Sequence, residues 1–592
     1  MISPQPDPAQ QKAHSLIDEG NRLEAEGSVD AAHARYRAAR DLAPELPRAH
    51  LNIGNVLVLL GDEKGAIAAY EAALACKPDF APANFNLGNL YLRLGQPREA
   101  VAQYECALRS RPSFVDAVVA LGNAHYELGQ LDAAGEYYRR AAQIRPDFAE
   151  AHSNLGIVLQ DLGRLAEAEA CYRRALAIKP ECEPAQRNLL FCLNYLERPA
   201  SDCLAQARLY GQMVSAMAPK PFSAWHCTRS PRPLRVALVS GDLCNHPVGY
   251  FLESWLTHRN PDTVELYAYV TGHVSDDMTA RLKPCFAAWT SLVGLSDEAA
   301  ARRIHDDGVH IAIDLAGHTG HSRLPLFAWK PAPVQVTWLG YFATTGVAQI
   351  DYVIADPWTL PVEQERYFTE RVWRLPRTRL CFAAPDPPVA VSTLPALASG
   401  RVTFGCFNHL SKVNDSVVAL WARLLGALPG SRLALRSKLL AQASVRQQTA
   451  ARFAALGIGE DRLLLQGPVS RAEYLAGYQV VDIALDPFPY TGGATTAEAL
   501  WMGVPVLTLA GEHFLSRQGV GLVTNAGLTD WVAQGTDDYV ARALRHAADL
   551  PALAALRTRL REQVLASPLF DGAAFAHAMQ DALQGMWLAR GG

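Results

Sequence analysis

A glycine-rich turn with the sequence GGATTAEAL starts at Gly492 and has the composition of an anion-binding site. Glycine lets the backbone come close to a ligand, so Gly492 and Gly493 leave room for a phosphate group. The amides of Ala494, Thr495 and Thr496 open the helix that follows, and a helix N-terminus carries roughly half a positive charge. We therefore expect this turn to be a diphosphate cradle, with an ordinary turn as the alternative.

Short apolar runs separated by amphipathic helical stretches follow residue 233, a pattern typical of α/β folds. The runs expected to be buried parallel strands are residues 234–242, 264–270, 309–318, 334–341 and 352–357, then 402–408, 432–437, 462–468, 480–487 and 504–511. A Pro/Ala-rich segment separates the two sets, which predicts two doubly wound domains with a cleft between them. Ligands bind outside the carboxyl ends of such strands, which places His246 and Lys412, in the loops after the first run of each domain, at the cleft.

Several common nucleotide-binding motifs are missing. Neither domain has GxGxxG after its first run, and no GxxxxGK[ST] loop is present, so a dinucleotide oxidoreductase or P-loop ATPase has little support. No two aspartates have the DxD spacing through which many sugar-nucleotide transferases hold a metal. If the chain is such a transferase, a metal-independent mechanism is favoured, and basic side chains and helix N-termini must meet the charge of the leaving diphosphate.

Self-similarity with a period of 34 residues marks the first part of the chain. Four series share one register: Gly20, Gly54, Gly88, Gly122 and Gly156; Gly27, Gly61, Gly95, Gly129 and Gly163; Tyr36, Tyr70, Tyr104, Tyr138 and Tyr172; Pro44, Pro78, Pro112, Pro146 and Pro180. Each unit is predicted to be two short helices, packed closely at the first glycine, turning at the second, filled by the tyrosine and ended by the proline. The units resemble the tetratricopeptide repeat in five copies over residues 12–182, which implies a right-handed solenoid whose concave groove binds extended peptide.

A polar series lies two residues before the first glycine of each repeat: Asp18, Asn52, Asn86, Ala120, Asn154 and Asn188. Amides on the inner face of a groove can hydrogen-bond the backbone of an extended segment whatever its side chains, so the four asparagines are candidate peptide-groove residues. Helix capping or simple decoration is the alternative. Because Asn188 continues the series, residues 183–210 are expected to form a sixth, modified helical pair.

The composition excludes several classes of partner. The 592 residues are 49% hydrophobic and 19% charged with a formal charge of -4, so no basic field is available for nucleic acid or an acidic membrane. The 11 cysteines lack CxxC spacing, which indicates reduced thiols rather than disulfides or a zinc site. No signal-peptide pattern and no run of ~18 apolar residues occurs, so a soluble, cytoplasmic protein is expected.

Five sequence motifs follow the repeats, in the order expected of a single protein family. After the repeats come GDLCNHPVGYF (241–251), DLAGHTGHSRL (314–324), KPAPVQVTWLGY (330–341), CFNHLSKVND (406–415) and LDPFPYTGGATTAEALWMGVPVLT (485–508). Together they resemble the O-GlcNAc transferase family, glycosyltransferase family 41, in a bacterial form, and the resemblance covers nearly the whole chain. It implies an inverting transfer of N-acetylglucosamine from UDP-GlcNAc to Ser/Thr hydroxyls of proteins, on a GT-B fold and without a metal or other cofactor.

The resemblance also implies an order of domains. The expected parts are an N-terminal tail over residues 1–11, five repeats over 12–182, a helical linker and partial repeat over 183–232, a first Rossmann-like domain on the acceptor side over 233–385, a linker over 386–400, and a second, nucleotide-sugar-binding domain over 401–592.

The matching positions imply the catalytic and nucleotide contacts. His246 matches the histidine near the acceptor hydroxyl and donor sugar, where it is a base or only an orienting group, and Lys412 matches the lysine that contacts the diphosphate. The other nucleotide-binding candidates are His409, Arg471, Tyr474, Gly493, Thr495, Thr496 and Glu498. Glu498 matches the acid that holds the ribose hydroxyls, and Tyr474, a histidine in animal members, has a ring that could stack on uracil. Packing or surface roles are the alternatives.

The candidates for the sugar and acceptor side are Asp314, His318, Thr319, Leu339, Gly340 and Tyr341. The resemblance places Thr319, Leu339 and Gly340 beside the donor sugar, whereas Asp314 and His318 are equally consistent with orienting their neighbours. Phe342 replaces a proline of animal members and is expected to alter the sugar pocket.

Two other functions stay open. The plant SPINDLY proteins share this architecture and transfer fucose from a guanosine donor, and MGVPVLT in this chain is close to that branch, so GDP-fucose is the alternative donor. The second alternative is a repeat scaffold whose transferase half is inactive. For the enzyme, the expected partners are protein or peptide acceptors and a nucleotide sugar, with no nucleic acid and no membrane.

Overall fold

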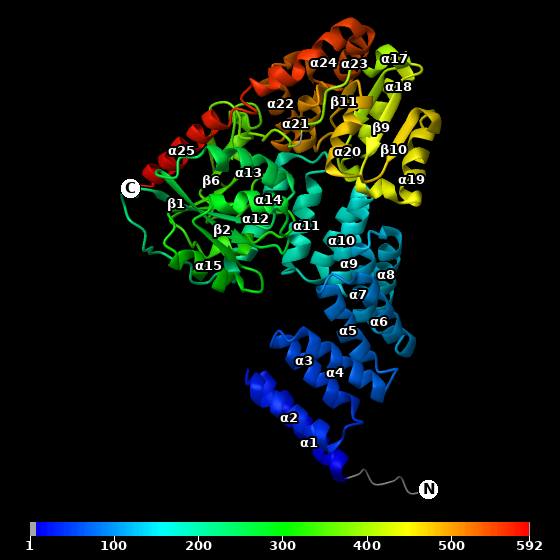
Figure 1. Ribbon diagram of the computed structural model, residues 1–592, viewed down its shortest axis with the longest axis vertical. Coiled ribbons are helices and arrows are strands. Elements are labelled where there is room, and N and C mark those ends of the chain that lie inside the picture. Colours follow the sequence, from blue (N-terminus) through cyan, green and yellow to red (C-terminus); the bar gives the residue numbers. More distant parts are fainter. Residues whose placement is uncertain (1–7, 387, 591–592) are drawn as a thin grey trace. The chain divides into compact units, whose positions relative to one another are not determined.

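The computed structural model describes residues 8–386 and 388–590, which divide into two compact units (Figure 1). One unit comprises the chain up to Leu159 together with Ala177–Pro180. The other comprises Gln160–Leu176 and the chain from Glu181 onward. The division therefore falls inside the fifth predicted repeat rather than after it. Within the described residues, no helix is both long and apolar enough to span a bilayer.

Helical pairs with the predicted 34-residue period build the first unit. Its helices are α1 (Pro8–Ala25), α2 (Val29–Leu42), α3 (Pro47–Leu59), α4 (Glu63–Cys76), α5 (Ala81–Arg93), α6 (Pro97–Ser110), α7 (Val115–Glu127), α8 (Leu131–Ile144) and most of α9 (Ala149–Asp161). A Cβ atom on Gly54 would lie 2.5 Å from the ring of Tyr70, so only glycine lets the two helices approach this closely. Gly61 has φ +78° in the turn between them. The predicted roles of the two glycines and the tyrosine are confirmed.

Three helices begin the second unit. They are α10 (Leu165–Ile178), α11 (Glu183–Leu193) and α12 (Ala200–Met217), and the last two are the predicted sixth pair. The carboxylate of Glu169 on α10 accepts a 2.6 Å hydrogen bond from Arg198, in the loop between α11 and α12. This ion pair, between a buried glutamate and an exposed arginine, connects α10 to the other helices of the second unit.

Two parallel sheets form the rest of the second unit, as predicted for the GT-B fold. The first has the order β3-β2-β1-β4-β5-β6-β7, and the second has the order β10-β9-β8-β11-β12-β13. Their strands are β1 (Leu234–Ser240), β2 (Val264–Val270), β3 (Ala288–Ser291), β4 (Ile311–Asp314), β5 (Val334–Thr337), β6 (Tyr352–Ala355), β7 (Arg371–Arg374), β8 (Thr403–Cys406), β9 (Arg432–Arg436), β10 (Leu463–Gln466), β11 (Ile483–Leu485), β12 (Val506–Leu509) and β13 (Val532–Ala533).

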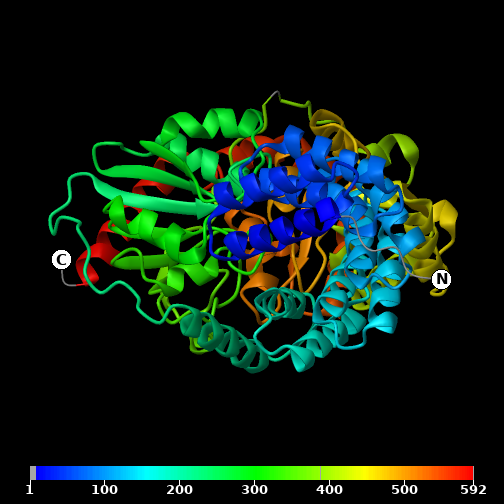
Figure 2. The same ribbon diagram turned by 90° about the horizontal axis from the view of Figure 1, so that it is seen from below.

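Helices connect and cover these strands. They are α13 (Pro247–His258), α14 (Asp277–Leu282), α15 (Asp297–Asp306), α16 (Leu324–Ala328), α17 (Pro395–Ser399), α18 (Asp415–Ala427), α19 (Ala443–Ala454), α20 (Arg471–Ala476), α21 (Ala494–Trp501), α22 (Gln518–Asn525), α23 (Thr536–Ala548), α24 (Leu550–Leu565) and α25 (Gly572–Ala589). The last helix, α25, lies along the first sheet domain in both views (Figure 1, Figure 2). The indole of Trp587 on α25 donates to the backbone oxygen of Arg229 at 3.2 Å. The predicted second domain, 401–592, therefore returns its C-terminal helix to the first domain.

Candidate functional site

A cleft of about 440 Å³ in the second unit collects side chains from the loops that follow the strands. Nine of the predicted residues or their immediate neighbours line it: His246, Thr319, Leu339, Gly340, His409, Lys412, Gly493, Ala494 and Thr495. The sequence predicted that these loops follow the carboxyl ends of strands in two parallel sheets. In the structure the loops line a single cleft.

Lys412 is the cation of this cleft. Its Nζ atom donates to Asn408 Oδ1 at 3.2 Å and to the backbone oxygen of Thr491 at 3.1 Å, and lies 4.0 Å from the ring centre of Tyr490. Burial lowers the pKa of Lys412 to about 8, while the nearby carboxylate of Asp486 acts in the opposite direction. The lysine is thus a fixed, partly desolvated positive charge, which interacts with an anion more strongly than a solvated one does.

The glycine-rich turn leads directly into α21 beside Lys412. The Gly492 N–H donates to Asp486 Oδ1 at 2.6 Å, and a Cβ on Gly492 would lie 2.5 Å from the Thr496 hydroxyl oxygen. In the described chain, the N–H groups of Gly493, Ala494 and Thr495 donate to no protein acceptor. These three amides are available for an anion.

Thr496 departs from the prediction. Its N–H donates to the Gly493 backbone oxygen at 3.1 Å, and its side chain is buried. The cradle is therefore shifted by one residue, because the helix closes its first hydrogen-bonded turn at Thr496. The Thr495 hydroxyl instead donates to Asn408 Oδ1 at 3.0 Å, the oxygen that also accepts from Lys412.

His246 caps the start of α13 at the opposite wall. Its Nδ1 atom accepts from the Val248 N–H at 3.4 Å and lies 3.7 Å from Asp242 Oδ2. Burial lowers the pKa of His246, partly opposed by Asp242, so the imidazole is neutral near pH 7. Both the predicted cleft position and the capping alternative hold, because the same side chain does both. His409, by contrast, turns its Nδ1 to the Ser411 hydroxyl at 2.7 Å while its ring lines the cleft.

Both carboxylate oxygens of Glu498 have a protein partner in this structure. The Arg471 guanidinium lies 2.6 Å from Glu498 Oε1, and the Tyr474 hydroxyl donates to Oε2 at 2.9 Å. Burial raises the pKa of Glu498. Arg471 also stacks on Tyr250 of α13, 4.7 Å from the ring centre, so it joins the two sheet domains. One hydrogen-bonded group outside the cleft lining thus contains Arg471, Tyr474 and Glu498. The prediction had given each of them a separate contact with the nucleotide.

Three predicted residues of the first domain reach the cleft. Leu339 has φ +75°, a strained value for a side chain of this size, and this backbone brings Leu339 and Gly340 to the wall. A Cβ on Gly340 would lie 2.0 Å from the Leu315 backbone oxygen, which excludes any other residue there. Thr319 lines the same wall.

The other three, Asp314, His318 and Tyr341, lie behind that wall, which for Asp314 and His318 favours the alternative that they orient their neighbours. Asp314 is buried and accepts hydrogen bonds from the Gly317 N–H at 2.9 Å and the Thr337 hydroxyl at 3.0 Å. His318 packs edge-on between two tyrosine rings, and burial lowers its pKa to about 3. The Tyr341 hydroxyl accepts from Asn194 at 3.0 Å. These side chains hold the loop that carries Thr319 in place.

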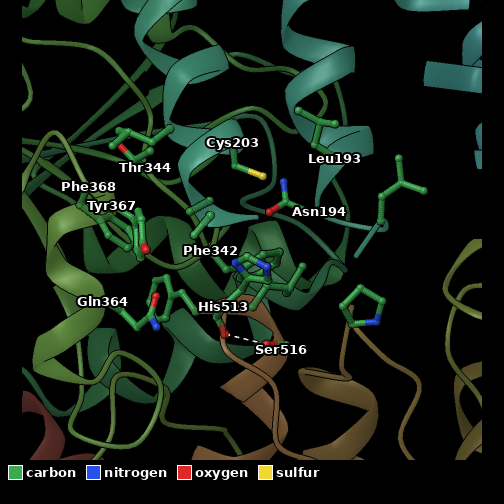
Figure 3. A pocket seen from close by; sticks show the side chains of 17 residues that line it. Leu193, Asn194, Cys203, Phe342, Thr344, Gln364, Tyr367, Phe368, His513 and Ser516 are labelled. Atoms are coloured by element: carbon green, nitrogen blue, oxygen red, sulfur yellow. Dashed lines mark hydrogen bonds between the residues drawn. The ribbon is translucent and has the colours of Figure 1, made fainter. Parts of the chain in front are cut away.

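A smaller pocket adjoins the cleft (Figure 3). Leu193, Asn194 and Cys203 from α11, its C-terminal end and α12 face Phe368 and His513 across it. Phe342 lines both spaces, and its ring lies 5.4 Å from that of Tyr490. Phe342, which by resemblance stands where animal members have a proline, therefore separates the pocket from the cleft.

The asparagines of the repeats connect successive repeats. Each donates its side-chain amide to an asparagine 31 residues earlier: Asn52 to Asn21 (2.9 Å), Asn86 to Asn55 (2.7 Å) and Asn154 to Asn123 (3.1 Å). The same three acceptors also receive a tyrosine hydroxyl, from Tyr36, Tyr70 and Tyr138 respectively, as Tyr70 donates to Asn55 at 2.9 Å. Asn188, on α11, makes no side-chain hydrogen bond within the described chain. Asn86 and Asn154 also line shallow hollows of the repeat surface, so peptide contact stays a prediction beside this structural role.

Comparison with known proteins identifies the family. The sequence matches glycosyl transferase family 41 over residues 185–383 and 388–579, and tetratricopeptide repeats over 54–95, 85–147 and 149–182. The chain belongs to glycosyl transferase family 41.

Solved and sequenced members of family 41 give more detail. A mutant of the Thermobaculum terrenum O-GlcNAc transferase is 34% identical, with a TM-score of 0.81 over 86% of this chain and 98% of that one. The tomato (Solanum lycopersicum) protein named probable UDP-N-acetylglucosamine–peptide N-acetylglucosaminyltransferase SPINDLY is 36% identical over 405 residues, 67% of this chain. A different plant protein, the Arabidopsis thaliana probable UDP-N-acetylglucosamine–peptide N-acetylglucosaminyltransferase SEC, is 28% identical over 367 residues, 60% of this chain. This chain spans 43% and 37% of the lengths of those two plant relatives.

Several cleft residues were not predicted. Asn408, Tyr490 and Gln518 line the cleft, and Asp242 flanks His246. Asn408 and Tyr490 stand inside motifs that the sequence offered, immediately beside the lysine loop and the glycine turn. Gln518 carried no signal of its own, because it begins a helix in a segment with no recognisable motif.

Proposed function

We propose that this chain is a protein O-glycosyltransferase that moves N-acetylglucosamine from UDP-GlcNAc to Ser/Thr hydroxyls, with inversion and without a metal. The observation that carries the proposal is the buried Lys412 beside three unpartnered amides of the glycine turn, in a cleft whose far wall bears the neutral imidazole of His246. Family membership and the names of the relatives support the donor and the acceptor class.

The reaction follows from these groups. The acceptor oxygen forms a bond to the anomeric carbon as the bond from that carbon to the β-phosphate oxygen breaks, and the electron pair goes to the diphosphate. Lys412 and the amides of Gly493, Ala494 and Thr495 stabilise the charge that develops there. Attack from the side opposite the leaving group inverts the anomeric carbon. His246 is the group positioned to accept or orient the hydroxyl proton.

Donor identity is tested by direct binding and product analysis. A ligand that binds the native state raises its melting temperature, so UDP, UDP-GlcNAc, GDP and GDP-fucose are compared by thermal shift. Mass spectrometry of a mixed acceptor pool then reads the added sugar. Addition of an N-acetylhexosamine supports the proposal, addition of a deoxyhexose supports the GDP-fucose alternative, and the absence of both binding and transfer favours the scaffold.

We also propose that the repeats hold protein acceptors through the asparagine series. Binding energy from a long acceptor would raise its effective concentration near the cleft, an advantage that a short peptide lacks. Alanine at Asn52, Asn86 and Asn154 should slow modification of long acceptors and leave nucleotide binding and donor hydrolysis unchanged. Because these amides also connect repeats, the melting temperature of the variant must be measured as well. Equal rates on a long acceptor would leave the series purely structural.

A further inference from the structure

Arg379 is a buried cation whose guanidinium makes no direct ion pair. It is 1% exposed and forms no salt bridge within the described chain, although the nearby Asp356 carboxylate acts to raise its pKa. The guanidinium lies 4.7 Å from the ring centre of Phe514 and 5.8 Å from that of Phe342, two walls of the pocket in Figure 3. Its Nε and Nη1 atoms have no hydrogen-bond partner. Burial lowers its pKa only to about 10, so the side chain is charged at neutral pH.

The backbone of this residue is fixed on both sides. The Arg379 N–H donates to Asp356 Oδ2 at 2.9 Å, and the Arg379 backbone oxygen accepts from the Trp338 indole at 3.0 Å. The main chain at Arg379 is therefore fixed on both sides, and one of its two anchors is the carboxylate of Asp356.

The single side-chain hydrogen bond of Arg379 leads to the cleft. Its Nη2 atom donates to Gln518 Oε1 at 2.6 Å, and Gln518 Nε2 donates to the Gly492 backbone oxygen at 3.3 Å. The N–H of the same glycine is held by Asp486. Gly492 is thus fixed at both ends: its N–H donates to Asp486, and its carbonyl accepts from the Gln518 amide, which Arg379 polarises.

These two hydrogen bonds to Gly492 set the direction of the Gly493 N–H, the first free amide of the glycine turn. In a trans peptide the C=O and the following N–H point in opposite directions, and the bond between Gly492 and Gly493 is trans. A carbonyl held against Gln518 therefore turns the Gly493 N–H away from Gln518, and Gly493 lines the cleft. The hydrogen bonds in such a chain polarise one another, so the guanidinium charge strengthens that donor as well as orienting it.

A comparison with the other buried arginine argues against a purely structural role. Arg557 is also 1% exposed, but its nitrogens donate to the backbone oxygens of Ser392, Val481 and Tyr478 and to the Ser392 hydroxyl. That pattern is expected of an arginine that joins segments. Burying a charge costs several kcal/mol when it is not compensated, and the N–H groups on both Nε and Nη1 of Arg379 lack an acceptor within the described chain.

We propose that Arg379 is a positioning residue for departure of the nucleoside diphosphate, acting through Gln518 on the glycine turn. The proposal rests on the proposed transferase function. The relay contributes most when negative charge has accumulated on the diphosphate, in the transition state and in the free product, and less in the intact donor.

The test compares three variants with the wild type of the full chain. Arg379→Met removes the charge, Gln518→Leu interrupts the relay but keeps the charge, and Arg557→Lys is the matched control at a buried arginine outside the cleft. We expect the first two to lower kcat for sugar transfer and for donor hydrolysis at least about tenfold, below the ~10²–10³ that loss of a direct donor costs. The affinity for UDP should fall by a similar factor while that for UDP-GlcNAc changes little. Combining both substitutions should cost no more than the larger single effect.

The outcomes separate the relay from its rivals. A structural role would weaken UDP and UDP-GlcNAc equally, lower the melting temperature and give the same pattern for Arg557→Lys. Unchanged kcat in a folded Arg379→Met or Gln518→Leu protein overturns the relay alone. If Arg379→Met does not fold, Gln518→Leu decides. A wild type that neither binds nor cleaves a nucleotide sugar refutes the proposed function itself.

Discussion

Replacing Lys412 by methionine tests the centre of the proposed mechanism with little change in volume. The substitution removes the positive charge and its hydrogen bonds to Asn408 and Thr491, and it leaves an unbranched apolar chain beside Tyr490. Asp486 keeps its hydrogen bonds from the Gly492 N–H and from the Thr508 hydroxyl, so no acid is left without a partner.

The magnitude follows from the burial of the lysine. Two unit charges ~4 Å apart at an effective dielectric constant of ~20 interact by about 4 kcal/mol. If that attraction acts mainly on the departing diphosphate, its loss slows the reaction by about 10³-fold. Stability should move the other way. The folded-state pKa of Lys412 lies below its ordinary value, so the unfolded chain binds more protons above about pH 8, and holding the ammonium in the fold is unfavourable below that pH.

The assay pairs turnover with stability. Release of the nucleoside diphosphate with a peptide acceptor measures transfer, and release without acceptor measures hydrolysis. The variant should lose nearly all of both while its melting temperature at pH 7 equals or exceeds that of the wild type. Residual transfer above about a tenth of the wild-type rate would remove Lys412 from the leaving-group role. A large fall in melting temperature would instead show that Lys412 stabilises the fold.

Further predictions concern metal, pH and the repeats. Activity should survive EDTA, and strict dependence on added Mn²⁺ or Mg²⁺ would contradict charge neutralisation by protein groups alone. Lys412 is charged below its pKa, so kcat/KM for the donor should fall above about pH 8, and a flat profile up to pH 10 would refute this assignment. Ala120→Asn should supply the missing donor to Asn89, which within the described chain accepts from Tyr104 alone, and raise the free energy of unfolding by about 0.5–1.5 kcal/mol; an unchanged urea midpoint would refute a stabilising role for the asparagine contacts between repeats. Gly88→Ala places a Cβ 2.6 Å from the Tyr104 ring and should destabilise the repeats by about 1–3 kcal/mol, whereas wild-type stability would mean that the helices can separate freely.

Much of the fold could be predicted because the 34-residue repeat and the apolar runs of the strands both follow from which residues are buried. The positive φ of Gly61 and the contact of Gly54 with Tyr70 repeat every 34 residues, and all ten expected strands are present. The strands β3, β7 and β13 were not predicted. β3 and β7 are the edges of the first sheet and are only partly buried, and β13 has two residues, so none of them has a continuous apolar run.

The candidate site was predictable in position but less so in its pairings. Loop residues after a strand are placed by the topology, and His246 and Lys412 reach the cleft for that reason. Which side chains then bond to one another depends on distances between separate elements. The contact of Glu498 with Arg471 and the connection of Arg379 to Gln518 join segments far apart in sequence, and no spacing rule reports them.

If Glu498 holds the donor ribose, as the family resemblance implies, its ion pair with Arg471 makes donor recognition an exchange of partners. The ribose then competes with the guanidinium for Oε1 of Glu498, and release of the arginine is unfavourable unless it gains another anion. A diphosphate brings such an anion together with the ribose, whereas a nucleoside brings only hydroxyl groups. The contact between Arg471 and Glu498 would therefore help to distinguish a nucleotide from a nucleoside, although neither bound ligand would leave it intact. Uridine should bind far more weakly than the loss of its direct phosphate contacts alone would require.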